Sequence, residues 1–174
     1  LPHIIDWFKK AGTYAVIMED KKYPKQNSLL EEGKHELESV DVFSEKIRIA
    51  KQYSGDMKVF ARLESLIAKH SEFEAIVRAE AYIQAGADGI MVHSKQKVDC
   101  SEVMEVGTKL RTQHPELTLI AVPTTYKLPK EHPFDITIKA NHLLRASLKA
   151  MQKYIAGEEV ELATVEDIFN ICGH

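Results

Sequence analysis

Charged and hydrogen-bonding side chains are concentrated in residues 19–28, which read Glu-Asp-Lys-Lys-Tyr-Pro-Lys-Gln-Asn-Ser. They directly follow the apolar run 14–18. A carboxylate at the end of a buried strand can hold a hard cation, and the lysine, amide and hydroxyl donors can neutralise phosphate or carboxylate oxygens. The string therefore suits a metal together with an anionic substrate. Taken alone, the composition of this string favours a solvated, charged loop.

The elements that must position these residues alternate between strands and helices. The predicted strands are short, rich in Val and Ile, and apolar on both faces, as expected for parallel strands covered by helices. They are residues 14–18, 58–62, 89–93, 117–122 and 135–138. Because helical patterns separate them, the sequence predicts an α/β fold with a parallel sheet.

The helical segments carry start and stop signals. Ser71-Glu72-Phe73-Glu74 is a capping box, and this helix is expected to end at Gly86. Its predicted apolar stripe consists of Phe73, Ile76, Val77 and Ile83. Two other helices are expected to bury Phe43, Ile47 and Ala50, and Val103, Val106 and Leu110. A long helix is predicted over residues 142–156, and a last one begins at a capping-box-like Thr164.

Chemistry in parallel α/β folds lies where strands end, because the following loops meet there. The predicted strand ends carry Glu19, Arg62 and His93. Each also has a structural interpretation: Glu19 could pair with Lys21 or Lys25 of its own loop, Arg62 could pair with the nearby glutamate at 64, and His93 could be a satisfied core histidine. Their shared position favours an anion site over packing.

Composition narrows the class of protein. The chain has 174 residues, 44% of them apolar, and a net charge of −3, so a single domain over residues 1–174 is expected, with no reason to expect nucleic acid as a partner. Its apolar runs are far shorter than the roughly 20 residues that span a membrane. Cys100 and Cys172 are too few for a disulfide framework, which favours reduced thiols and a cytoplasmic location.

The segment 19–28 resembles the signature loop of the phosphoenolpyruvate mutase family, within the isocitrate lyase superfamily of (β/α)8 barrels. The shared pattern is Glu-Asp-Lys, five residues, then Asn-Ser. Further stretches resemble the family in the same order, namely residues 61–64, 79–95, 122–124 and 140–147.

The resemblance implies an Mg²⁺-dependent interconversion of phosphoenolpyruvate and phosphonopyruvate, which forms the carbon–phosphorus bond of phosphonate biosynthesis. It implies that Glu19 lies in the outer shell of the metal and contacts it through water. A modified TIM barrel has about eight strands, and about five are recognisable here. The remaining strands, with the aspartates for Mg²⁺ and the amides for the substrate carboxylate, are expected before Leu1, so this chain would be the C-terminal part of the barrel.

The resemblance also implies roles for the other site residues. Arg62 would clamp the phosphoryl oxygens, Asn27 would hold the group in transit, and His93 would donate to the substrate. Lys25 and Ser28 would belong to a mobile gating loop over residues 21–39. A C-terminal helix within residues 158–174 would be exchanged between subunits of a homo-oligomer, a dimer or tetramer.

Three alternatives remain open. Phosphonopyruvate hydrolase is a sibling that lets water take the phosphoryl group, and the intact Lys25, Asn27 and Ser28 favour the mutase. A carbon–carbon lyase would resemble a pattern with a cysteine in the loop, and residues 19–28 contain none. A non-catalytic assembly or regulatory remnant is the third. The family's aromatic residue before Ala140-Asn141-His142 is replaced by Lys139, a departure that bears on substrate detail.

Overall fold

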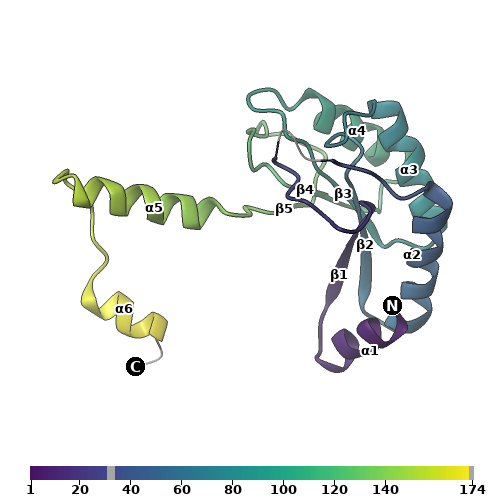
Figure 1. The fold of residues 1–174 in the computed structure, drawn as a ribbon, viewed down its shortest axis with the longest axis horizontal. Coiled ribbons are helices and arrows are strands. Elements are labelled where there is room, and N and C mark those ends of the chain that lie inside the picture. The colour runs from purple at the N-terminus through teal and green to yellow at the C-terminus, as the bar shows by residue number, and fades with distance from the viewer. Residues whose placement is uncertain (31–33, 173–174) are drawn as a thin grey trace. The chain divides into compact units, whose positions relative to one another are not determined.

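The computed structural model describes residues 1–30 and 34–172. The chain divides into two compact units, Leu1–Lys139 and Ala140–His174. Among the described residues, the first unit contains the sheet and helices α1 to α4, and the second contains α5 and α6 (Figure 1). The expectation of a single domain over residues 1–174 stays a prediction.

The first unit is built on a five-stranded parallel sheet in the order β1-β2-β3-β4-β5, so each strand pairs with its neighbour in sequence. The parallel α/β architecture predicted from the apolar runs is confirmed. The strands are β1 (Ala15–Glu19), β2 (Lys58–Leu63), β3 (Gly89–Val92), β4 (Thr118–Ala121) and β5 (Ile136–Thr137). In this register Glu19 lies directly opposite Arg62.

The alternation of side chains along the strands separates two faces of the sheet. On one face, residues such as Ala61, Ile90 and Leu119 pack with the helices in the main core. On the other face, Phe60 and Met91 belong to a small cluster whose members come from strands and strand ends. Glu19, Arg62 and His93 each follow a residue of this second cluster, or one packed against it, by two or four positions, so they lie on the same face of the sheet. These three predicted site residues therefore point away from the helices.

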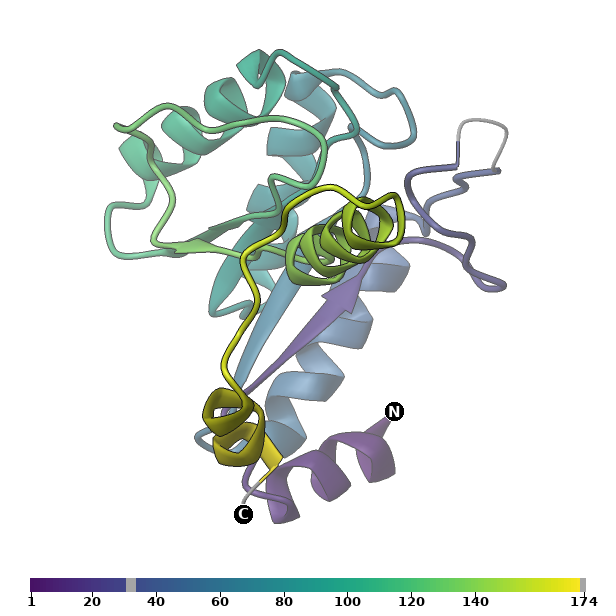
Figure 2. The ribbon, with the colours of Figure 1, turned by 90° about the vertical axis from the view of Figure 1, so that its left-hand side faces the viewer.

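Four helices belong to the first unit (Figure 2 shows them from a second side). They are α1 (Pro2–Lys10), α2 (Val40–Ser54), α3 (Glu72–Gln84) and α4 (Ser101–Gln113). The Oγ atoms of Ser39 and Ser71 accept hydrogen bonds from Val42 N and Glu74 N, each 3.3 Å long, and thereby cap α2 and α3. The chain leaves α3 through Gly86 at φ 102°, where a residue without a Cβ is favoured.

The buried faces of two helices agree with the sequence, and that of the third agrees only in part. The predicted stripes of α2 and α4 are confirmed, because all six of their residues are buried in or beside the core. For α3 the prediction is confirmed for Ile76 and Ile83, which are partly buried against the core, and is wrong for Phe73 and Val77, which are 75% and 40% exposed. The helix instead buries Ala75, Arg78, Ala79 and Tyr82. The small alanines let α3 lie close to the sheet, and this turn of the helix directs Arg78 and Tyr82 to the strand ends.

Asp88 closes the opposite end of the sheet. Its Oδ2 accepts from Val59 N at 2.8 Å and from Lys51 Nζ at 2.7 Å. Because Asp88 precedes β3, this contact lies at the amino ends of the strands and acts as a structural anchor.

The second unit contains α5 (His142–Ile155) and α6 (Val165–Cys172), and neither helix has a buried residue. The predicted start of α6 is confirmed, since Thr164 Oγ1 accepts from Asp167 N at 3.0 Å. Residues 173–174 of the predicted C-terminal segment 158–174 lie outside the described residues. Exchange of this helix between subunits stays a prediction. Among the described residues no helix is both long and apolar enough to cross a membrane.

Candidate active site

Glu64 is the centre of a cluster of charged side chains just beyond the end of β2. Its side chain is fully buried. One oxygen accepts from Arg62 Nε and lies against His93 Nδ1, each at 2.7 Å. The other oxygen lies 2.9 Å from Lys21 Nζ and accepts from the hydroxyl of Ser28. We call these five side chains the strand-end network.

The donors around Glu64 keep it ionised. Burial by itself would raise the pKa of this carboxyl, but the hydrogen bonds from His93 and Lys21 and the charge of Arg62 outweigh it and hold the pKa well below its ordinary value of 4.5. Nδ1 of His93 is committed by its contact with Glu64 and by Nη2 of Arg62, which lies 2.9 Å from it. Nε2 is then the ring nitrogen that can meet a substrate, as either acceptor or donor depending on its protonation.

Glu19 lies beside the strand-end network at the end of β1. Its carboxylate oxygens are 3.5 Å from Lys21 Nζ and 3.8 Å from Arg62 Nη1, and its side chain is 19% exposed. The structural interpretations of the sequence therefore hold as well: Glu19 does pair with Lys21, and Arg62 does pair with Glu64. Such pairs also preorganise the site, because they fix the guanidinium before a substrate arrives.

The remaining loop residues have different placements. Lys25 Nζ donates to the backbone oxygen of Glu19 at 3.1 Å, although Lys25 is exposed. Asn27 is exposed, and its Oδ1 accepts from Leu29 N at 2.9 Å within the loop. The structure thus brings Glu19, Ser28, Arg62 and His93 together, but it does not place the Asn27 amide in the strand-end network. Residues 31–33 of the predicted loop 21–39 lie outside the described residues.

The sequence predicted Lys21 and Glu64 only as ion-pair partners of Glu19 and Arg62, and it assigned them no role in the site. It did not predict Asp20, Arg78 or Tyr82 as residues that support the site. Asp20 Oδ1 accepts from Glu64 N, and Asp20 Oδ2 accepts from Tyr82 OH, both at 2.9 Å. Burial raises the pKa of Asp20, although the hydrogen bonds from Glu64 N and Tyr82 and the charge of Arg78 oppose that shift. The sequence feature that could have indicated this pair is the i, i+4 spacing of Arg78 and Tyr82, which places both side chains on one face of α3.

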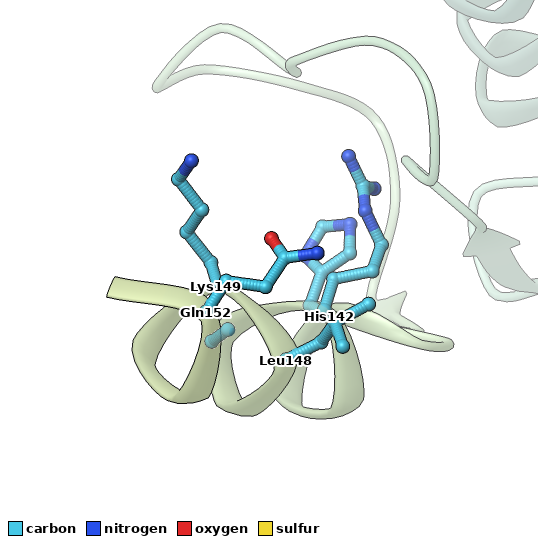
Figure 3. Close-up of a pocket in the computed structure, with 6 residues that line it drawn as sticks. His142, Leu148, Lys149 and Gln152 are labelled. Atoms are coloured by element: carbon cyan, nitrogen blue, oxygen red, sulfur yellow. The ribbon is translucent and has the colours of Figure 1, made fainter. Parts of the chain in front are cut away.

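Two hollows of the surface differ in their suitability for a ligand. A cavity of about 280 Å³ in the first unit is lined by Leu29, Lys69, Lys95, Lys97 and Thr125. Its lysines come from the segments that follow β2 and β3, so it is a cationic cavity at the carboxyl ends of strands. Figure 3 shows the other hollow, whose lining residues all belong to α5, with His142, Leu148, Lys149 and Gln152 labelled. A single exposed helix does not enclose a ligand, and we assign no site there.

The model of the family described as phosphoenolpyruvate phosphomutase matches residues 1–157 of the chain. The chain belongs to the phosphoenolpyruvate phosphomutase family. This confirms the membership predicted from the loop and strand-end motifs. Members of this family resemble the chain in sequence and in structure, as the following relatives show.

Among the curated relatives, a phosphoenolpyruvate phosphomutase from Tetrahymena pyriformis is 37% identical, over 91% of this chain and 57% of its own length. A phosphonopyruvate hydrolase from Variovorax sp. (strain Pal2) is 34% identical, over 88% of this chain and 54% of its own. The chain therefore spans little more than half the length of these relatives.

Solved structures show the same relationship. A phosphoenolpyruvate phosphomutase from Streptomyces platensis subsp. rosaceus superposes with a TM-score of 0.81 at 32% identity, covering 99% of this chain and 64% of that one. A phosphonopyruvate hydrolase complex with oxalate and Mg²⁺ has a TM-score of 0.77 at 31% identity and covers 63% of that chain. The fold is thus that of the superfamily barrel, of which this chain matches part.

Proposed function

We propose that the protein carrying this chain is a phosphoenolpyruvate mutase. It interconverts phosphoenolpyruvate and phosphonopyruvate by moving a phosphoryl group between oxygen and carbon, the step that forms the carbon–phosphorus bond in phosphonate biosynthesis. The observation that carries the proposal is the convergence of Arg62, His93 and Ser28 on Glu64, at the carboxyl ends of parallel strands. Membership of the family supports it.

The chemistry of these side chains suits phosphoryl transfer. A loose, metaphosphate-like transition state gains most from positive charge held in position and from exclusion of water. Arg62 uses Nε and Nη2 on Glu64, each 2.7 Å from one carboxylate oxygen, which fixes the plane of the guanidinium. Nη1, 3.8 Å from Glu19, is the nitrogen proposed to meet a phosphoryl oxygen. His93, oriented by Glu64, donates from Nε2 to the substrate. Lys25 and Asn27 complete the site from the loop.

The cationic cavity supports an anionic substrate. Lys69, Lys95 and Lys97 line it together with Leu29, the residue directly after Ser28. Three positive side chains around one opening raise the local concentration of small anions and speed their capture. Phosphoenolpyruvate and phosphonopyruvate both carry a carboxylate and a phosphoryl group, so both are attracted by such an opening.

Magnesium enters the proposal only for the whole protein. Over residues 1–30 and 34–172 no group of three or more His, Cys, Asp or Glu is placed to hold a metal ion. Glu19, with a side chain that is 19% exposed, is the residue we propose for the outer shell, contacting the ion through water. A bound Mg²⁺ would supply positive charge to the substrate oxygens.

Phosphonopyruvate hydrolysis is the second candidate. It is favoured by the 34% identity to the hydrolase from Variovorax sp. (strain Pal2). The hydrolase reaction and the mutase reaction both break the carbon–phosphorus bond. They differ in the acceptor of the phosphoryl group, which is water in the hydrolase reaction and the enolate oxygen in the mutase reaction. The mutase is the first candidate because the loop retains Lys25, Asn27 and Ser28.

Phosphorus NMR on the full-length protein with phosphonopyruvate, with and without Mg²⁺, tests the proposal. The mutase produces a phosphoenolpyruvate signal that requires Mg²⁺. Inorganic phosphate in its place identifies a hydrolase, and an unchanged spectrum identifies a non-catalytic remnant. Either of the last two results overturns the proposed function.

The proposal also includes the oligomeric state of the protein and its location in the cell. The exposed apolar residues of α6, Ile168, Phe169 and Ile171, suit packing against a second copy of the chain, so we propose a homo-oligomer, a dimer or tetramer. Cys100 and Cys172 are both free thiols, which supports a cytoplasmic location. Analytical ultracentrifugation of the full-length protein measures the assembly, and a monomer at micromolar concentration contradicts it.

A further inference from the structure

The connection between β1 and α2 is closed at its base by backbone hydrogen bonds. Glu38 N donates to Asp20 O at 2.8 Å, and Lys22 N donates to Glu36 O at 2.9 Å. These bonds join the start of the connection, at Asp20 and Lys22, to its end, at Glu36 and Glu38. The described part between these ends includes Lys25 and Ser28, so the base determines where both side chains can reach.

Arg78 of α3 holds both ends of this base at once. Its Nη1 donates to the backbone oxygen of Glu38 at 3.0 Å and lies 3.5 Å from Asp20 Oδ2. The same nitrogen donates to Tyr82 OH at 3.1 Å, and Tyr82 OH donates onward to Asp20 Oδ2 at 2.9 Å. The Arg78 side chain is only 8% exposed. We call Arg78, Tyr82, Asp20 and Glu38 the loop clasp.

The loop clasp is bonded directly to the strand-end network. Asp20 Oδ1 accepts from the backbone nitrogen of Glu64, the residue whose carboxylate holds Arg62 and His93. Ser28, from the clasped connection, donates to that same carboxylate. A shift at Arg78 is therefore transmitted through Asp20 and the backbone of Glu64 to the position of Ser28 over the Glu64 carboxylate.

From these contacts we propose that Arg78 is a positioning residue that decides whether the phosphoryl group reaches the enolate oxygen or water. The inference rests on the proposed function. In the mutase reaction the carbon–phosphorus bond breaks and the enolate oxygen bonds to phosphorus. If water enters, its oxygen bonds to phosphorus to give inorganic phosphate, and a proton goes to the substrate carbon to give pyruvate. Holding Ser28 and Lys25 over the strand ends excludes that water.

The experiment compares full-length Arg78→Met and Tyr82→Phe with Arg48→Met as the matched control. Arg78→Met keeps the aliphatic stem and removes the donors, and Tyr82→Phe keeps the ring that packs 4.7 Å from Phe43. Arg48 is an exposed arginine on α2 paired with Glu45 at 3.0 Å.

Phosphorus NMR measures the ratio of inorganic phosphate to phosphoenolpyruvate formed from phosphonopyruvate. Loss of a charge-assisted hydrogen bond should raise that ratio by about tenfold in Arg78→Met. Tyr82→Phe should raise it less, and the control should leave it unchanged. If Arg78→Met lowers the rate but leaves the ratio of inorganic phosphate to phosphoenolpyruvate unchanged, Arg78 does not determine which acceptor receives the phosphoryl group.

A second readout separates this inference from the proposed function. Limited trypsin digestion of the folded protein reports on the loop clasp through cleavage after Lys22 and Lys25, whatever reaction the protein performs. Cleavage should be about tenfold faster in Arg78→Met than in the wild type or in Arg48→Met, because local opening follows the lost bonds. Equal cleavage rates overturn the clasp. Faster cleavage in a protein that forms only phosphate retains the clasp and rejects the mutase.

Discussion

Lys21 and Glu64 form a buried ion pair, with Nζ 2.9 Å from Oε2 and side chains that are 1% and 0% exposed. Replacing Glu64 by Gln removes the negative charge but leaves Lys21 and Arg62 charged beside it. An uncompensated buried charge of this kind costs about 3–5 kcal/mol. We therefore expect Glu64→Gln to lower the free energy of unfolding of the full-length protein by that amount in urea titrations. Glu105→Gln, at an exposed position on α4, is the control and should change it little.

The same pair makes stability depend on pH in acid. The pKa of Glu64 is lowered in the folded state from its ordinary 4.5, so its stabilising contribution is present above that pH. It is lost as the pH falls below 4.5 toward the folded-state pKa, because the unfolded chain binds the proton first. The free energy of unfolding should decline over this window in the wild type. In Glu64→Gln the decline should be smaller, and an equal slope in both proteins would refute the assignment.

Asp20 acts on stability with the opposite sign. Burial raises its pKa above 3.8, so its contribution is fully present below that pH and is lost as the pH rises through the folded-state value. Asp20→Asn should therefore destabilise the protein most at low pH relative to the wild type, and least near neutrality. The measurement is the difference in urea midpoint between the two proteins from pH 3 to pH 7, and a constant difference contradicts the prediction.

Asn27 tests whether the loop must rearrange around the substrate. Its Oδ1 accepts from Leu29 N, a bond that an aspartate can also make. Asn27→Asp thus preserves the local turn but replaces the amide donors by a negative charge where the phosphoryl group is proposed to pass. We expect kcat to fall about 100-fold or more. Tryptic cleavage of the loop should remain at the wild-type rate. Full activity would remove Asn27 from the site.

The cationic cavity predicts a dependence on salt. Lys69→Gln and Lys95→Gln together remove two of its positive charges. Steered capture of an anion weakens when charge is removed, so kcat/KM for phosphonopyruvate should fall about tenfold at low ionic strength while kcat changes little. The variant should also lose part of the wild-type salt dependence. Lys109→Gln on the exposed side of α4 is the control, and an equal effect from it would contradict a role for the cavity.

Gly89 allows β3 to lie close to its neighbours. A Cβ at this position would clash with the backbone oxygen of Thr118 and would be 2.9 Å from Cδ1 of Phe60. Gly89→Ala should therefore destabilise the protein by about 3 kcal/mol, since backbone of β4 would have to move. In Gly107→Ala the nearest atoms belong to the side chains of Phe134 and Pro133, so the loss should be smaller. Thermal unfolding of both variants measures the difference.

The sequence by itself determined the elements and the position of the chemistry along them. Apolar runs and capping residues are local signals, and they were sufficient for the parallel strands and for the buried faces of α2 and α4. They also placed Glu19, Arg62 and His93 at strand ends. Because side chains alternate along a strand, residues at equivalent ends of parallel strands share a face, so their meeting followed from the order of the strands.

Only the tertiary structure decided which face of α3 is buried and what lies at the centre of the site. Two adjacent stripes of that helix are both compatible with packing, and the close approach allowed by Ala75 and Ala79 selected the one that carries Arg78 and Tyr82. Asp20 meets Glu64 across 44 residues of sequence and Arg78 across 58. Contacts over such separations depend on how helices dock on the sheet, and a local pattern contains no information about that docking.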